Sequence, residues 1–474
     1  RREKVKLKRN LISLVLALAV GSASAETIRV AIGTQDTTIN CATGGLLIRE
    51  LNLLEKYLPR DGKYKDAKYE IVWKNFTSGP PLTNEMVADK LDIGSMADFP
   101  GSLNAAAFKR AGKKSIFVTA LSGSPQGSGN GLVVPSDSPI NSLAELKGKS
   151  VSVPFGSTAH GMLLRALKAN GIDSEKDVNL VSQSPEVGGT ALQSHKIDAH
   201  ANFVPFADLF PYRGFARKIF DGSEANAPTF HGSLVNAEYA QKYPEVVVAF
   251  LRAAIEADRL LAAEPEKYSE LIAKVTGIEA EVNYLFHGPL GLQTRDFTWK
   301  PEYRQALKTA IDTLALLKRN DTPLSADEVI DERYLRQAFK LSGLDYEKQL
   351  KSYAKSPLQA KDAKTGEAIR DLSRATQVWV EGEAKVRNYS SPEAALFAVR
   401  DAEKAGKKIR VVFVHDRDSG LKLLANQAWF ARSPNGQIDA YLQKGAAEKS
   451  AKASGGSVVN FAQTFATTAK LAAR

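Results

Sequence analysis

The sequence predicts an α/β protein of two hinged lobes, followed by a smaller α+β domain. Three features of the chain lead to this prediction. Strand-like and helix-like segments alternate over residues 27–343, which is typical of parallel sheets covered by helices on both faces. Two stretches rich in Gly, Ser, Pro and Asn interrupt this alternation, at 122–131 and 221–233. Over 346–374 the composition changes to Lys, Ala, Ser, Asp and Gln, which is typical of a charged linker.

The first 25 residues have the layout of a secretory signal peptide. Residues 1–10 hold six basic side chains and one acid, 11–20 are almost wholly apolar, and Ala23-Ser24-Ala25 offers small residues at both cleavage positions. The apolar run is about half as long as the roughly 20 residues of a membrane-spanning helix. We therefore expect a Sec-type signal peptide (1–25) cleaved before Glu26, a periplasmic protein, and no stable membrane insertion.

Short β-branched segments predict the strands, and amphipathic segments between them predict the helices. About 300 residues is large for one sheet, so we expect two lobes within 26–345. The Gly-rich stretches could equally be surface loops, but they bracket one block, which favours two crossings between lobes. Lobe 1 then spans about 26–122 and 230–345, and lobe 2 about 123–229. The strand-like segments are 27–33, 69–75, 115–121, 131–135, 150–156 and 178–183, and helical patterns include 44–58, 83–91 and 161–171.

Beyond the predicted linker (346–374), the pattern predicts a compact α+β domain at 375–474. Its strand-like and helical segments alternate within roughly 100 residues, the size of a small domain. The strand-like segments are 376–382, 408–416, 427–433 and 458–461, and the helical ones are 391–406 and 438–456.

Charge and cysteine content exclude several classes of protein. The formal charge of +11 includes +5 from residues 1–10 (six bases minus one acid), which leaves about +6 for the rest. Without a basic stripe or a recognised motif, this surplus does not indicate a nucleic-acid partner. Cys41 is the only cysteine, so the chain has no internal disulfide and no Cys-rich zinc or iron–sulfur site. We expect a monomer.

Four segments that each follow a strand and open a helix are candidate ligand loops, because ligands of open α/β sheets bind at the carboxyl ends of strands. In one of them, Gly156-Ser157-Thr158 leads into a helix whose N-terminus offers free N–H groups and a positive dipole end. Each segment is also explained as an ordinary turn or helix cap. The loops contain no arginine before their helices begin, so neutral donors and helix ends would bind a small oxyanion. The segments are 33–45, 92–102, 153–171 and 196–209.

On these segments the chain resembles the nitrate/sulfonate/taurine (SsuA/TauA-like) family of ABC-transporter substrate-binding proteins, over about 27–345. The resemblance rests on IRVAIGTQ, KLDIGSMADFPGSLNAAAFKRAG, INSLAELKGKSVSVPFGSTAHGMLLRALKANGI and ALQSHKIDAHANFVPFADL. It implies a type II periplasmic-binding fold, a small anionic ligand such as a sulfonate, nitrate or similar oxyanion, and delivery to an ABC permease. With the loops, it gives as candidate ligand-binding residues Gln35, Asp36, Thr37, Asp98, Gly156, Ser157, Thr158, Asn202 and Phe203.

The C-terminal domain is similar to the NosL family of copper-handling accessory proteins, over roughly 370–465. KVRNYSSPEAALFAV and ANQAWFARSPNGQIDAYLQKGAAEKSAKASGGSVVNF carry this resemblance. Copper(I) prefers soft ligands, yet Cys41 and all three methionines precede residue 346. We expect no cofactor. The alternative function is a copper-handling or copper-complex-binding accessory protein of a periplasmic copper-enzyme pathway. Its weak metal candidates are Cys41, His415, Asp416 and Asp418, of which the last three also fit a strand end that enters a turn.

Enzyme signatures are lacking in the sequence. It has no G-x-S-x-G elbow, no H-E-x-x-H, and no cysteine-rich iron motif like that of a related branch that makes a thiamine pyrimidine precursor. His160 follows Ser157 and could imitate a Ser/His pair, but the i, i+3 spacing at a helix start fits capping better. We therefore expect a binding protein and not an enzyme.

Overall fold

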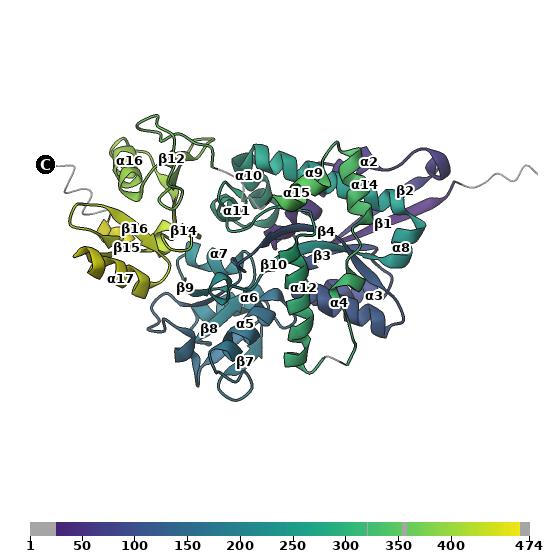
Figure 1. Cartoon of the computed structure of the whole chain (residues 1–474), viewed down its shortest axis with the longest axis horizontal. Helices are drawn as coiled ribbons and strands as arrows, with labels where there is room; N and C mark the ends of the chain where they lie inside the picture. The colour runs from purple at the N-terminus through teal and green to yellow at the C-terminus, as the bar shows by residue number, and fades with distance from the viewer. Residues whose placement is uncertain (1–24, 320, 353–357, 465–474) are drawn as a thin grey trace, which may run out of the picture.

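The computed structural model describes residues 25–319, 321–352 and 358–464 (Figure 1). The predicted signal peptide lies outside the described residues, except for Ala25. Two five-stranded sheets form the two lobes, and two smaller sheets follow toward the C-terminus. Among the described residues, no helix is both long and apolar enough to span a membrane.

Lobe 1 is built on a sheet of order β2-β1-β3-β10-β4. Strand β1 pairs in parallel with β2 and β3, whereas β10 is antiparallel to both β3 and β4. The C-terminal ends of β1 and β3 face the second lobe and lead into the candidate ligand loops 33–45 and 92–102. The strands are β1 (Thr27–Thr34), β2 (Lys68–Asn75), β3 (Ile93–Ala97), β4 (Ser115–Ser124) and β10 (Thr229–Asn236).

Lobe 2 repeats this arrangement with a sheet of order β7-β6-β8-β5-β9. Strand β6 is parallel to β7 and β8, and β5 is antiparallel to β8 and β9. The expectation of parallel sheets is therefore confirmed for β1, β2 and β3 and for β6, β7 and β8, and it is wrong for β5 and β10. Each lobe contains a strand that arrives from the other lobe, β5 or β10, and that strand enters its sheet in the opposite direction. The strands are β5 (Gly131–Pro135), β6 (Ser150–Val153), β7 (Asn179–Ser182), β8 (Ala199–Asn202) and β9 (Ala216–Asp221).

Two short segments connect the lobes, and we call them the first crossing (125–130) and the second crossing (222–228). They are shorter than the Gly-rich stretches of the sequence, because β4 continues to Ser124 and β10 already begins at Thr229. Gly222 N–H donates to the Asn130 carbonyl (2.7 Å), so the two crossings lie side by side. A molecule with two adjacent crossings can bend there.

Helices cover the faces of both sheets. In lobe 1 the long α9 (Pro244–Ala263) turns an apolar face inward, with Val247, Phe250 and Leu261 fully buried. The helix predicted over 44–58 is broken into α1 (Leu46–Glu50) and α2 (Leu53–Tyr57), because Asn52 adopts a left-handed φ of 52°, and η1 (Ile39–Gly44) precedes α1. The other lobe helices are α3 (Gly79–Val87), α4 (Asp98–Arg110), α5 (Thr158–Ala169), α6 (Pro185–Gln193), α7 (Phe206–Tyr212), α8 (Ala237–Lys242), α10 (Pro265–Thr276), α11 (Ala280–His287), α12 (Pro301–Thr313), α13 (Ala326–Val329) and α14 (Arg333–Leu341).

The C-terminal domain (375–464) contains two antiparallel sheets, of order β12-β11-β13-β14 and β16-β15-β17, and the helices α16 and α17. The helix predicted over 438–456 is shorter, because its first residues form a strand. The elements are β11 (Thr376–Val380), β12 (Arg387–Tyr389), α16 (Pro392–Lys404), β13 (Ile409–His415), β14 (Lys422–Leu424), η6 (Ala425–Gln427), β15 (Trp429–Arg432), β16 (Ile438–Tyr441), α17 (Lys444–Ser454) and β17 (Ser457–Asn460).

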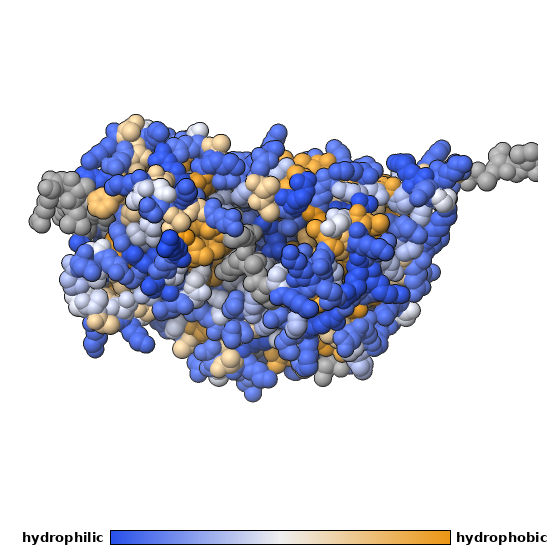
Figure 2. Space-filling view, turned by 45° about the horizontal axis from the view of Figure 1, so that its top comes forward, coloured by the Kyte–Doolittle hydropathy of each residue, from blue (hydrophilic) through white to orange (hydrophobic). Residues whose placement is uncertain are grey.

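The segment expected as a linker is partly packed. Residues Tyr346–Lys351 form α15, and the buried Tyr346 hydroxyl donates to Glu332 (2.7 Å) in lobe 1. Further on, Leu358 and Ile369 are buried together with Ala375 at the edge of the C-terminal domain. The face of the molecule in Figure 2 is mostly hydrophilic, with apolar residues in small patches, as for a protein that buries its core.

Candidate ligand-binding site

A small cavity lies where the two lobes meet. It has a volume of about 10 Å³, the room of a single water molecule. Six of the residues around it come from lobe 1 and three from lobe 2, so the cavity exists only while the lobes are together. Its lining residues are Gln35, Thr38, Gly79, Ala97, Pro100, Ser157, Thr158, Phe203 and His231.

Two helix N-termini face this cavity, one from each lobe. Ala97 precedes α4 in lobe 1, and Ser157 precedes α5 in lobe 2. Ser157 Oγ accepts the backbone N–H of His160 (3.2 Å), which confirms the capping role expected for this pair. His160 Nδ1 in turn accepts the N–H of Gly156 (3.0 Å). The N–H groups of a first helical turn and the positive end of the dipole favour an anion at this place.

Neutral side chains supply the other polar groups of the cavity. Gln35 Nε2 donates to the carbonyl of Ser95 (2.9 Å), which fixes its amide against β3. Thr38 is 3% exposed, and its hydroxyl has no hydrogen-bond partner among the described residues. A buried hydroxyl without a partner is costly in a folded protein, and this one is placed to donate to a group that enters the cavity.

His231 reaches the cavity from β10 as an uncharged ring. Its burial lowers the pKa of the imidazole to about 3, so it is neutral at pH 7. Asn40 Nδ2 donates to His231 Nδ1 (3.4 Å), which leaves the ring proton on Nε2. Thr38 and His231 therefore both offer donors without bringing a charge.

A buried carboxyl, that of Asp98, adjoins the cavity wall, and Arg165 interacts with it electrostatically. Asp98 lies between the lining residues Ala97 and Pro100, and burial raises the pKa of its carboxyl to about 6 while Arg165 opposes the rise. Arg165 is on α5, and its Nη1 donates to Thr313 Oγ1 (3.3 Å) of lobe 1. The prediction of neutral donors was based on the loop residues and left out this cation, because Arg165 lies two turns into α5.

The lobes are in contact around the cavity. A Cβ atom placed on Gly156 would lie 2.9 Å from Pro80 Cγ across the cleft, and Lys318 forms an ion pair with Glu175 (3.4 Å) between the lobes. A groove of about 760 Å³ continues outward between the lobes, and Pro80, Phe155 and Gly156 are among its lining residues. The structure therefore represents a closed arrangement of the lobes.

The candidate residues from the sequence divide into two groups. Gln35, Ser157, Thr158 and Phe203 line the cavity, and Gly156 lines the adjoining groove.

The others lie behind the cavity wall or beside it. Asp36 is held by Arg49 in an ion pair (2.9 Å), and the half-buried Thr37 does not reach the cavity. Asn202 is fully buried and accepts the N–H of Phe203 (2.8 Å), so it positions a lining residue. Asp98 follows the lining residue Ala97 directly and precedes the lining residue Pro100 by two positions.

The metal candidates do not converge. Cys41 is buried, and burial raises the pKa of its thiol. His415 Nδ1 donates to the Ala375 carbonyl (2.7 Å), while Asp416 accepts the N–H groups of Asp418, Ser419 and Leu442. Residues 416–420 thus form the turn that was the alternative interpretation. Within 25–319, 321–352 and 358–464, no group of three or more His, Cys, Asp or Glu side chains is arranged to hold a metal ion.

Two lobes, two adjacent crossings and a cavity lined from both sides define a two-lobed solute-binding protein. The comparisons agree with this class. The family model described as "NMT1/THI5 like" matches residues 85–268. A protein of Escherichia coli K12 assigned as an aliphatic-sulfonates-binding protein is 30% identical over 288 residues, which cover 59% of this chain and 84% of that protein. The taurine-binding periplasmic protein of the same organism is 31% identical over 270 residues, or 54% of this chain and 79% of that protein.

The chain therefore belongs to the SsuA/TauA-like family of periplasmic substrate-binding proteins. Solved structures agree in fold. The alkanesulfonate-binding protein SsuA of Xanthomonas axonopodis pv. citri, bound to MOPS, superposes with a TM-score of 0.53 at 24% identity and covers 65% of this chain and 100% of its own. The nitrate-binding protein NrtA of Synechocystis PCC 6803 gives a TM-score of 0.50 at 13% identity, over 70% of this chain and 92% of its own. At these identities the likeness concerns the fold alone.

Proposed function

We propose that the protein captures a small anion, a sulfonate, nitrate or similar oxyanion, in the periplasm and delivers it to the permease of an ABC importer. One observation carries the proposal: the interlobe cavity is flanked by a helix N-terminus from each lobe and lined by neutral donors. Relatives named for sulfonate and taurine binding support it.

The donor set suits an oxyanion bound without a paired cation. An oxyanion accepts hydrogen bonds through several oxygens and donates none, and it spreads one charge over them. The hydroxyls of Thr38 and Thr158, the first turn of α5 and His231 can each donate to a different oxygen. No lysine or arginine lines the cavity, so the helix ends supply the favourable electrostatic field.

Capture follows from the division of the cavity between the lobes. A ligand that contacts Gln35 and Thr38 on one side and Ser157 and Thr158 on the other gains its full set of bonds only when the lobes close. Binding therefore shifts the lobes toward a closed arrangement, which must be slightly wider than the one described because the cavity here has room for only a water molecule. The permease would recognise that ligand-bound closed arrangement. We propose no catalytic step, since the nearest Ser/His pair, Ser157 and His160, is engaged in helix capping.

A panel of anions tests the proposal. Ethanesulfonate, taurine, MOPS, nitrate, bicarbonate and sulfate are titrated into the full-length mature chain, with thermal unfolding and calorimetry as readouts. At least one should raise the unfolding temperature and bind stoichiometrically. The same anion should decrease the radius of gyration or leave it at the closed value. If none of the six anions raises the unfolding temperature or gives a calorimetric binding signal, the proposal is wrong.

The variant Thr38→Val tests whether the ligand binds in this cavity. The change keeps the shape of the side chain and removes the hydroxyl that has no partner. A hydrogen bond to a charged group contributes about 1.5–3 kcal/mol, so the affinity should fall about 10- to 100-fold. The matched control is Thr190→Val, because Thr190 is exposed on α6 and bonds only the local Glu186 carbonyl (3.0 Å). Equal ligand affinities of the two variants would show that the ligand binds elsewhere in the protein.

For the C-terminal domain we propose a NosL-like fold without copper chemistry. The turn role of Asp416 and the buried thiol of Cys41 support this reading. Protein purified without a His-tag is loaded with Cu(I) and Cu(II), dialysed and measured for metal. Stoichiometric copper would contradict the proposal.

A further inference from the structure

The C-terminal domain is attached to lobe 1 by charged groups. Arg410 on β13 bonds Glu281 of α11 through Nε and Glu270 of α10 through Nη1, both at 2.6 Å. Its guanidinium also stacks over the ring of Trp379, 4.0 Å from the centroid. Such a planar, doubly paired cation fixes the relative orientation of two surfaces.

Aromatic packing extends this attachment. Tyr284 of α11 is 2% exposed and lies against Trp379 and Phe413 of the C-terminal domain, each with ring centroids 5.5 Å apart. Gln377 Nε2 donates to the Tyr284 hydroxyl (3.1 Å). Because apolar area and directed bonds are combined here, we expect this interface to stay intact when the lobes move.

Two glutamines of the same domain form hydrogen bonds with lobe 2. Gln443 Nε2 donates to the Ile219 carbonyl (3.0 Å) and to Glu224 Oε1 (2.9 Å), and Gln427 Nε2 approaches the Pro211 carbonyl (3.5 Å). Figure 1 shows the resulting arrangement, in which the C-terminal domain lies beside α10 and α11 as well as beside α7 and β9.

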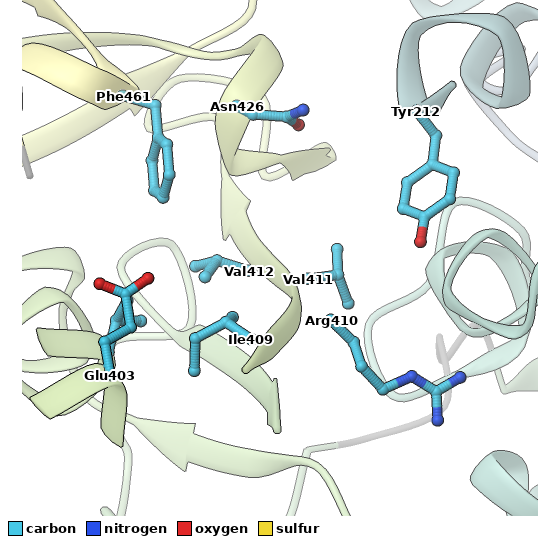
Figure 3. A pocket seen from close by; sticks show the side chains of 9 residues that line it. Tyr212, Glu403, Ile409, Arg410, Val411, Val412, Asn426 and Phe461 are labelled. Atoms are coloured by element: carbon cyan, nitrogen blue, oxygen red, sulfur yellow. The ribbon is translucent and has the colours of Figure 1, made fainter. Parts of the chain in front are cut away.

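Two pockets lie at the border between the C-terminal domain and lobe 2. A pocket of about 260 Å³ lies between Tyr212 of α7 and the C-terminal domain. In Figure 3, Tyr212 stands on one side of this pocket and Phe461 and Glu403 on the other. A second cavity of about 280 Å³ lies between the C-terminal domain and both crossings, with Gln126 and Ser223 in its wall. An interface with such gaps can separate at little cost.

The residue that Gln443 contacts is part of the second crossing. Glu224 accepts the N–H of Asp221 through Oε2 (2.8 Å), and Asp221 Oδ1 accepts the N–H of Ser223 (2.9 Å). Asp221 is fully buried and is held by Lys218 at 2.5 Å. The Gln443 side chain therefore holds a rigid group at the point about which the lobes turn.

We propose that the C-terminal domain is an intramolecular latch: it travels with lobe 1, and Gln443 holds the second crossing and lobe 2 in the closed arrangement. Opening turns lobe 2 about the crossings and so moves Ile219 of β9 relative to lobe 1, and hence relative to a domain fixed on lobe 1. The bonds of Gln443 are made in the closed arrangement described here, so they favour it over the open one. The proposal rests on the proposed function only where ligand affinity is concerned.

The variant Gln443→Ala in the full chain tests the latch without any ligand. We expect a larger radius of gyration in small-angle scattering than for the wild type, and several-fold faster amide exchange across 222–228. The control is Gln437→Ala, because Gln437 is exposed and its Nε2 donates to Asp439 (3.1 Å) inside the C-terminal domain. If Gln443→Ala and Gln437→Ala scatter and exchange alike, the latch does not exist.

Ligand affinity gives a second readout. With ethanesulfonate as the probe, Gln443→Ala should weaken binding about three- to tenfold, since it removes two bonds that favour the closed form. An unchanged or tighter affinity would overturn the proposal. If ethanesulfonate does not bind the wild type, sulfonates of this kind are not the ligand of the proposed function. The scattering and amide-exchange experiments still test the latch, because they need no ligand.

Discussion

Gly156 of lobe 2 lies against Pro80 of lobe 1 beside the ligand cavity. A Cβ atom on Gly156 would be 2.9 Å from Pro80 Cγ, and the φ of Gly156 is +78°. Each residue is the chain neighbour of a cavity-lining residue, Ser157 or Gly79. The contact thus reports how far the lobes close.

Gly156→Ala should hold the lobes apart. The added methyl group meets Pro80, so the ligand affinity should fall at least fivefold and the radius of gyration should increase. Gly171→Ala is the control, since its φ of +67° imposes similar backbone strain but no atom lies within 4 Å of the new methyl group. Both variants should lose about 1 kcal/mol of unfolding free energy. Only Gly156→Ala should bind the ligand more weakly. An equal loss of affinity in both variants would show that backbone strain, and not the contact with Pro80, is the cause.

Ser157→Ala should lower both stability and affinity. Loss of the cap on α5 costs about 1 kcal/mol and loosens the helix N-terminus that faces the anion. Ser391→Ala removes an equivalent cap, on α16, where Ala394 N–H donates to Ser391 Oγ at the same 3.2 Å. Urea unfolding should give similar losses for the two variants, whereas calorimetry should show weaker anion binding for Ser157→Ala alone.

Anion affinity should rise as the pH falls through about 6. Burial raises the pKa of Asp98 to about 6 from an ordinary value of 3.8, so this carboxyl is charged at pH 7.5 and neutral at pH 5. Its charge opposes a nearby anion, and protonation removes that repulsion; we expect about three- to tenfold tighter binding at pH 5. A sulfonate is suitable as ligand because it stays ionised over this range. The anion affinity of Asp98→Asn should change little with pH. If this variant still binds the anion three- to tenfold more tightly at pH 5, Asp98 is not the group that causes the pH dependence.

Lys218→Met should destabilise lobe 2 strongly. Lys218 is buried between Asp221 (2.5 Å) and Asp208 (3.1 Å), and its loss leaves two buried carboxylates without a cation. Removing one partner of a buried ion pair costs about 3–5 kcal/mol at pH 7. Lys308→Met breaks an exposed pair with Asp312 (2.9 Å) and should change the midpoint of unfolding little. Similar midpoints for both variants would show that the buried pair contributes nothing.

In the two lobes, the alternation of strands and helices predicted β1, β2, β4, β5, β6 and β7 but missed β8 and β9, and for a common reason it also missed β3 and β10. Both strands contain glycines, which the pattern associates with loops. In the fold these glycines are required by packing. A Cβ on Gly94 would lie 2.4 Å from Leu82 Cδ2, and a Cβ on Gly232 would lie 2.5 Å from the Thr119 carbonyl oxygen. Such long-range contacts leave no local signal in the chain.

The same limit applies to the site. Gln35, Ser157, Thr158 and Phe203 were predicted because each follows the end of a strand. His231 was missed, since it reaches the cavity only through the register of β10, which places it opposite Ala97 of β3. Register between strands distant in the sequence depends on the packed core and cannot be read from local composition.

The solitary, buried Cys41 has a practical consequence. Its thiol is the only one in the sequence, and burial raises the pKa of that thiol, so little reactive thiolate forms at neutral pH. A fluorophore or spin label can therefore be coupled to a cysteine introduced on each lobe without background from the native chain. The protein can thus be made into an optical sensor of its own ligand, one that reports each closure as a change in distance between two dyes.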